Sequence, residues 1–184
     1  RSNSMTVRIT KPEFNLRDKL NYLDFDRVPY DKMPAGSIIQ TNYTRFDYSG
    51  TNNEFETTSS TYQASPFLVK ISPKFSSSII KIQAAINIKQ NTGSNYIGVA
   101  LFKSVDGGSF ANFTGGTTGH GLITYRISGG GTAWDHVNFM VYDTPNTTSP
   151  IIYKLYLRSN DNSQNVRIGE NGAEEFMSAM EVRQ

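Results

Sequence analysis

The chain has 184 residues, a mass of 20.5 kDa, a formal net charge of +2 and no cysteine. This length suits one domain, and 37% hydrophobic residues supply enough apolar surface for one core, which excludes wholesale disorder. The lack of cysteine excludes disulfide scaffolds, thiolate zinc sites and cysteine nucleophiles. The sequence has neither the long apolar run that would predict a membrane span nor the pattern of a secretion signal. Its small, scattered positive charge does not favour nucleic-acid binding.

The first 34 residues differ in pattern from the rest. Residues 1–4 precede the first methionine and are interpreted as a cloning remnant. Residues 10–26 are rich in charge and predict a short α-helix, and Pro29 and Pro34 block its continuation. Three leucines at helical spacing form an apolar stripe on it: Leu16, Leu20 and Leu23. The stripe needs cover, either from its own domain or from another copy, so we interpret residues 5–34 as an attachment or oligomerisation segment with a linker.

From residue 35 onward the pattern changes to period two, with β-branched and aromatic residues between turns rich in Gly, Asn and Ser. The strands are not interleaved with helices, which excludes a parallel sheet with crossover helices. We therefore predict an all-β, antiparallel jelly-roll sandwich over residues 35–184. The predicted strands are Ser37–Tyr43, Phe55–Tyr62, Phe67–Ser72, Ser78–Lys89, Tyr96–Ser104, Leu122–Ile127, His136–Tyr142, Ile151–Leu157, Val166–Ile168 and Phe176–Val182.

The sequence carries no recognisable catalytic motif. The glycine-rich stretch between Asp106 and Gly131 lacks the spacing of a phosphate-binding loop and does not lead from a strand into a helix. His120 and His136 have no companion at metal-ligand spacing, and the carboxylates are scattered without a selected pair. We expect no enzyme activity, no cofactor and no metal site.

Aromatic residues in polar loops suggest a different chemistry. An exposed ring can stack on the apolar face of a sugar while neighbouring polar groups bind its hydroxyls. We favour Trp134 as the stacking ring, with Asp135 as a hydroxyl acceptor. The alternatives are that these aromatics cap the sandwich or fill a subunit interface, and that Trp134 is buried at the edge of the following strand. The remaining candidate ligand-binding residues are Phe46, Tyr48, Phe110 and Phe113.

Several short stretches resemble one group of virion proteins. They read Arg8-Ile-Thr-Lys-Pro-Glu-Phe-Asn-Leu-Arg-Asp-Lys-Leu, Met33-Pro-Ala-Gly-Ser-Ile-Ile-Gln, Ile97-Gly-Val-Ala-Leu-Phe-Lys, Tyr142-Asp-Thr-Pro, Tyr153-Lys-Leu-Tyr and Met180-Glu-Val. These stretches resemble small virion proteins of marine tailed phages, in which a short N-terminal segment precedes a jelly roll. That group is similar in architecture to the tumour-necrosis-factor and complement-type jelly roll, which implies a homotrimer without catalytic residues.

The resemblance implies a structural virion protein, assembled in the cytoplasm of the bacterial host. It would be a trimeric fibre or tip domain, bound to other virion proteins through the N-terminal segment and to a host surface glycan through its loops. A capsid decoration or fibre protein and a monomeric carbohydrate-binding module are the alternatives. The last predicted strand is apolar on both faces, so we expect its second face, with Met177 and Ala179, to meet a threefold-related copy.

Overall fold

The computed structural model describes residues 29–46, 54–90, 96–114, 121–126, 132–160, 165–169 and 174–184. The chain divides into two units, residues 1–34 and 35–184. The helix predicted over residues 10–26, with its leucine stripe, lies outside the described residues. The described part of the first unit contains a 3-10 turn, η1 (Tyr30–Lys32). No helix in the described ranges is long and apolar enough to cross a membrane.

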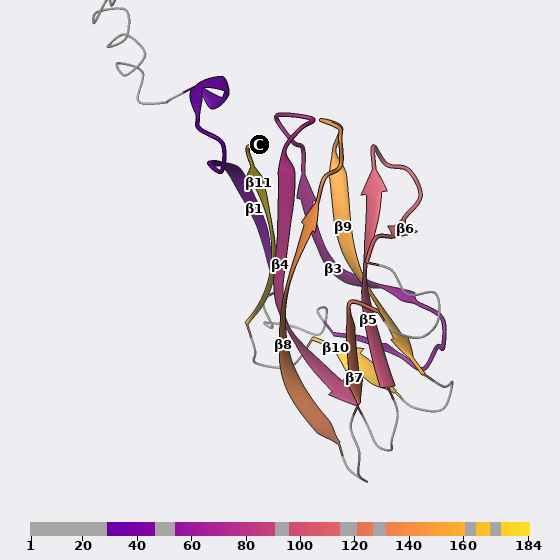
Figure 1. The fold of residues 1–184 in the computed structure, drawn as a ribbon. Helices are drawn as coiled ribbons and strands as arrows, with labels where there is room; N and C mark the ends of the chain where they lie inside the picture. The colour runs from indigo at the N-terminus through magenta and orange to yellow at the C-terminus, as the bar shows by residue number, and fades with distance from the viewer. Residues whose placement is uncertain are drawn as a thin grey trace, which may run out of the picture. The chain divides into compact units, whose positions relative to one another are not determined.

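The second unit is built from two antiparallel sheets (Figure 1). The first sheet contains β1 (Ile38–Phe46), β2 (Phe55–Thr57), β4 (Ile79–Gln90), β8 (Ala133–Asp143), β10 (Val166–Ile168) and β11 (Glu175–Val182). The second sheet contains β3 (Gln63–Ile71), β5 (Tyr96–Val105), β6 (Ala111–Asn112), β7 (Ile123–Arg126) and β9 (Ile151–Ser159).

The strand order identifies the topology. The long strands of the first sheet run β1-β11-β4-β8, and β10 pairs with β4 beyond the end of β11. In the second sheet the order is β3-β9-β5, and the short strands β6 and β7 pair with different parts of β5. The chain passes repeatedly from one sheet to the other, as in the double Greek key of a jelly roll. The predicted all-β, antiparallel jelly-roll sandwich is confirmed.

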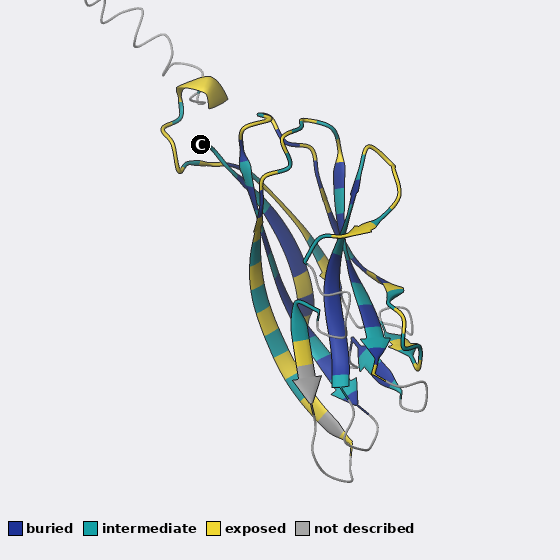
Figure 2. Ribbon diagram, turned by 45° about the vertical axis from the view of Figure 1, so that its right-hand side comes forward, coloured by how far each residue is buried: buried dark blue, intermediate teal, exposed yellow. Residues whose placement is uncertain are grey.

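The core lies between the two sheets and follows the period-two pattern of the strands. Every second residue of β4 and β9 is buried, while β8 alternates between exposed and intermediate residues, visible as yellow and teal bands in Figure 2. Members of the core from β4 and β9 include Ile80, Ile82, Ile86, Ile88, Ile151, Tyr153, Leu155 and Leu157. These are the inward residues that alternation in the sequence predicts for the two strands.

One predicted strand is wrong. The structure ends β2 at Thr57 and begins β3 at Gln63, instead of continuing one strand from Phe55 to Tyr62. Between them, the Ser59 amide donates to Thr57 Oγ1 at 3.0 Å and the Thr61 amide donates to Ser59 Oγ at 3.1 Å. These local side-chain bonds compete with sheet pairing and turn the chain.

A fully buried carboxylate holds the last strand in place. Glu181 lies near the end of β11 and pairs in register with the core residue Ile80. Its two oxygens accept hydrogen bonds from the amides of Lys74 and Phe75 and from two side chains. The donors and distances are Lys74 N at 2.8 and 2.9 Å, Phe75 N at 3.0 Å, Ser78 Oγ at 2.8 Å and Gln40 Nε2 at 2.7 Å. Burial of this charge is tolerated because these donors replace water.

A second polar cluster joins the two sheets. Asp143, on β8, accepts hydrogen bonds from Lys103 Nζ at 3.0 and 3.1 Å and from the Tyr153 hydroxyl at 2.6 Å. Lys103 and Tyr153 belong to β5 and β9 of the other sheet. Burial, the hydrogen bond to Asp143 and its negative charge all raise the pKa of Tyr153 above its ordinary value.

We expect the protein to lose much of its stability when the Glu181 carboxylate is replaced by a neutral side chain. Glu181→Gln places an amide NH₂ among donors, so we expect the free energy of unfolding to fall by about 3 kcal/mol in urea titrations. The matched control is Glu174→Gln, whose exposed carboxylate pairs with Arg45 and should change stability by less than about 1 kcal/mol. Equal effects of the two substitutions would contradict the assigned role of Glu181.

The raised pKa of Tyr153 predicts a loss of stability at high pH. The folded state favours the neutral phenol, so this contribution is fully present below the ordinary tyrosine pKa of 10.0 and is lost as pH rises above it. Urea midpoints measured from neutral pH upward should fall more steeply above pH 10 in the wild type than in Tyr153→Phe. Parallel curves for the two proteins would exclude this contribution.

Candidate functional site

Large exposed apolar side chains gather on one side of the sandwich. In the described ranges of the second unit, all of them belong to β1, β8 and β11 of the first sheet and point away from the core. They are Ile38, Tyr43, Trp134, Met140, Tyr142 and Phe176, with exposed fractions of 55, 74, 44, 48, 57 and 44%. Clustered exposed apolar side chains are typical of surfaces that contact another molecule.

The strand register brings most of these side chains together. Tyr142 pairs with Lys81, which pairs with Met180. In the next outward row, Met140, Gln83, Ser178 and Tyr43 follow one another across the sheet. We call the outward side chains of Tyr43, Met140, Tyr142, Phe176, Met180 and Val182 the exposed apolar face. A hollow of about 260 Å³ lies on it, bordered by Met140 and Phe176.

The predicted trimer contacts Met177 and Ala179 are wrong. Both side chains are fully buried within a single chain and belong to the core. The alternation of β11 is the reverse of that expected, because the odd-numbered positions also carry Glu175 and Glu181, whose buried carboxylates accept hydrogen bonds from amides and side chains. The outward positions are therefore Phe176, Ser178, Met180 and Val182.

The opposite outer face of the sandwich has aromatic side chains of a different kind. Phe102 and Tyr156 stack on each other with ring centroids 3.8 Å apart, and Tyr62 contacts Phe102 edge-on at 5.8 Å. Burial raises the pKa of Tyr156. These rings cover one another, whereas among the described residues no such ring stacking covers the exposed apolar face.

Trp134 lies further along the outer side of β8. A hollow of about 450 Å³ is bordered there by Asn87, Trp134, Asp135 and His136. The Lys89 ammonium lies 4.1 Å from the centre of the indole ring. His136 Nδ1 donates to Asn87 Oδ1 at 2.7 Å, which leaves the Asn87 amide nitrogen and His136 Nε2 as further polar groups. The site thus combines an exposed ring with an ammonium, an amide, an imidazole and the Asp135 carboxylate.

One expectation about this region needs correction. Trp134 is neither a loop residue nor buried at a strand edge, because β8 begins at Ala133 and the indole is partly exposed. Asp135 borders the same hollow as Trp134, and its Oδ1 accepts a hydrogen bond from the His136 amide. Asn87 and Lys89, which the sequence did not single out, add an amide and an ammonium beside the ring.

The other predicted ligand-binding aromatics do not join Trp134. Phe46 is buried in the core against Phe67, with ring centroids 4.3 Å apart, so it is unavailable for stacking. Tyr48 lies outside the described residues. Phe110 and Phe113 flank β6, which pairs with the second half of β5 at the end of the sandwich away from Trp134. Phe113 packs against the core.

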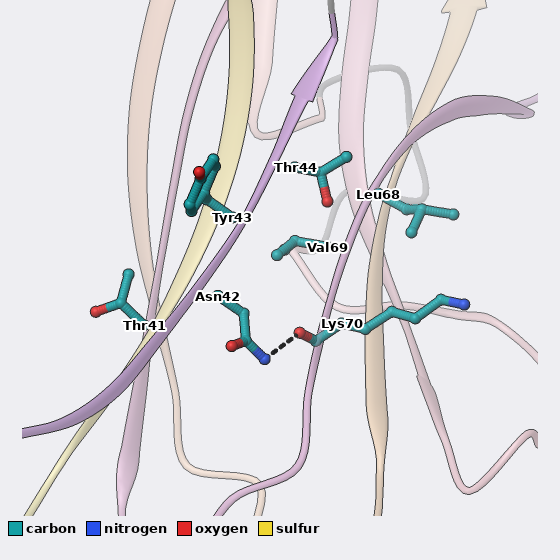
Figure 3. Close-up of a pocket in the computed structure, with 7 residues that line it drawn as sticks. All are labelled: Thr41, Asn42, Tyr43, Thr44, Leu68, Val69 and Lys70. Carbon is teal, nitrogen blue, oxygen red and sulfur yellow. Dashed lines mark hydrogen bonds between the residues drawn. The ribbon is translucent and has the colours of Figure 1, made fainter.

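A further hollow of about 450 Å³ separates the edge strands β1 and β3 (Figure 3). Asn42 Nδ2 donates across it to the Lys70 carbonyl at 2.9 Å, and Gln40 Nε2 donates to the Ser72 carbonyl at 2.6 Å. These bonds satisfy carbonyls at the open edge of β3, where Pro66 and Lys70 also discourage strand addition. We interpret this hollow as the place where side-chain hydrogen bonds join the two sheets at their edges, and not as a ligand site.

In the part of the chain that the structure describes, no group of acidic or histidine residues could hold a metal ion.

Comparison with known proteins adds little to the geometry. No family model and no curated protein matches the chain. Among solved structures, a chain from "Structure of infectious bursal disease virus Gx strain" is similar over 79% of this chain, with 10% identity and a TM-score of 0.31. The match spans 37% of that viral chain, and at this TM-score it carries no argument about function.

The observed alternation of β11 predicts that a charge destabilises the fold at an inward position but not at an outward one. Ala179→Glu buries an unpaired charge in the core, so we expect loss of the folded β signal in circular dichroism. Phe176→Glu lies on the outer side and should leave that signal intact. If Ala179→Glu remains folded while changing only the mass in solution, the alternation described here is wrong.

Proposed function

We propose that this chain is a non-enzymatic structural protein of a virion: a homotrimeric fibre or tip domain of a tailed phage that binds a host surface glycan. The observation that carries the proposal is the exposed apolar face. A free monomer would leave several large apolar side chains of one sheet in water, whereas self-association buries them.

The face suits a closed assembly of identical copies. It lies on the rigid four-strand row β1-β11-β4-β8, so its side chains keep fixed relative positions. The exposed ring of Tyr142 and the hollow beside Phe176 would both contact a second copy. The resemblance to trimeric virion proteins supports three copies, and closed rotational symmetry limits the assembly to a defined size.

The remaining parts of the proposal concern attachment and recognition. Residues 5–34 would bind other virion proteins, which would leave the jelly roll to contact the host. The hollow at Trp134 supports a glycan contact because it joins an exposed ring to polar side chains. A rigid trimer would present three such sites, and multivalency raises weak sugar binding by orders of magnitude. Capsid decoration is the second candidate, since it would use the same trimer.

The mass in solution tests the assembly. Light scattering should give about three times the chain mass of 20.5 kDa for the wild type, and about one chain mass for the double variant Met140→Glu, Phe176→Glu, because like charges would be buried together. The matched control is Ala64→Glu, an exposed position on the outer side of the other sheet, which should leave the mass unchanged. A monomeric wild type would overturn the proposal and favour a monomeric carbohydrate-binding module.

A further inference from the structure

The Trp134 hollow combines groups that recognise different parts of one ligand. The indole offers an apolar ring face, while Asn87 and His136 offer hydrogen-bonding groups on the same outward side of β4 and β8. Saccharides present this combination, with an apolar ring face and peripheral hydroxyls. The hollow of about 450 Å³ is also within the size range of small-ligand sites.

The charges around the hollow narrow the ligand class. On the side away from Trp134, Arg167 pairs with Lys89 in register and forms ion pairs with Glu54 at 2.9 Å and Glu56 at 2.7 Å. The Asp135 carboxylate borders the hollow and accepts a hydrogen bond from the His136 amide at 2.8 Å. Lys89 instead places its ammonium over the indole, and within the described ranges no carboxylate lies at ion-pair distance from it.

We propose that the Trp134 hollow binds an acidic saccharide, whose ring stacks on the indole and whose carboxylate pairs with Lys89. This proposal rests on the glycan-binding part of the proposed function and names the ligand class. An ammonium that contacts only a ring keeps its charge available, and a carboxylate in that position forms a charge-assisted hydrogen bond. His136 Nε2 and the Asn87 amide then bind ring hydroxyls.

The site remains accessible in the proposed trimer. Trp134 precedes Met140 by six residues on one strand, a separation of about 20 Å along β8. His136 and Asn138 are the outward residues between them, and neither is apolar. The exposed apolar face and the saccharide site therefore occupy different ends of the same sheet surface.

The single tryptophan of the chain reports directly on this site. The full chain is first applied to a glycan array that carries sialylated and uronate-containing glycans beside their neutral parent glycans. We expect selective retention on the acidic members, weaker at high salt. Titration of the best acidic glycan should then change the fluorescence of Trp134. Equal binding of neutral parents, or no acidic glycan bound, would overturn the proposal.

Two lysine variants separate this site from the rest of the surface. Lys89→Gln should weaken binding of the acidic glycan by about tenfold or more, with little effect on a neutral parent. Lys154→Gln is the matched control because Lys154 also lies over a ring, that of Phe110, on the other sheet. Unchanged affinity of Lys89→Gln would overturn the role of Lys89.

An adsorption experiment with host cells separates failure of the saccharide site from failure of the proposed receptor-binding function. If the wild type adsorbs to host cells but acidic glycans leave Trp134 fluorescence unchanged, the site is wrong while the proposed function survives. If the wild type is trimeric yet does not adsorb to host cells or bind any glycan, the receptor-binding function fails together with the site. Trp134→Ala with the fold intact by circular dichroism should abolish acidic-glycan binding.

Discussion

The buried carboxylate of Glu181 determines which side chains of β11 face the core and which face outward. Its donors lie in the β3–β4 connection and on β1, so it can be satisfied only when it faces the inside of the sandwich. Because side chains alternate along a strand, this choice fixes every other residue of β11. Met177 and Ala179 join the core, and Phe176, Met180 and Val182 turn outward. The exposed apolar face follows from that single assignment.

The two sides of the sandwich consequently play different roles. On the second sheet, the outward rings of Phe102 and Tyr156 stack on each other within one chain. On the first sheet, Met140, Tyr142 and Phe176 remain in solvent. The Asp143 cluster ties the sheets together at the core, so the first sheet presents its outer side chains from a rigid support. The proposed self-association and the proposed glycan binding would then use one surface, at opposite ends of β8.

The sequence predicts the fold better than the site, for identifiable reasons. Alternation in residues 78–89 and 151–157 is local information, and it predicts both strands and their buried sides. The facing of β11 is not local, because Glu175 and Glu181 look like surface residues until distant donors are brought to them. Phe46 lies in the core although polar residues surround it in sequence. Lys89 and Asn87, which lie beside Trp134, come from the neighbouring strand β4, so only the pairing of β4 with β8 identifies them.

Self-association through the exposed apolar face is measured directly by how accessible this face is to a reagent in the native protein. Because the chain has no cysteine, the substitutions Met140→Cys and Ala64→Cys each introduce one thiol, on the outer sides of the first and second sheets. Rates of maleimide labelling under native conditions compare the two positions, and labelling in urea provides the unfolded reference. If a second copy covers the face, the thiol at position 140 reacts many times more slowly than that at position 64 in the native protein, and equally fast in urea. Equal native rates would show that the face is uncovered and that the chain does not associate through it.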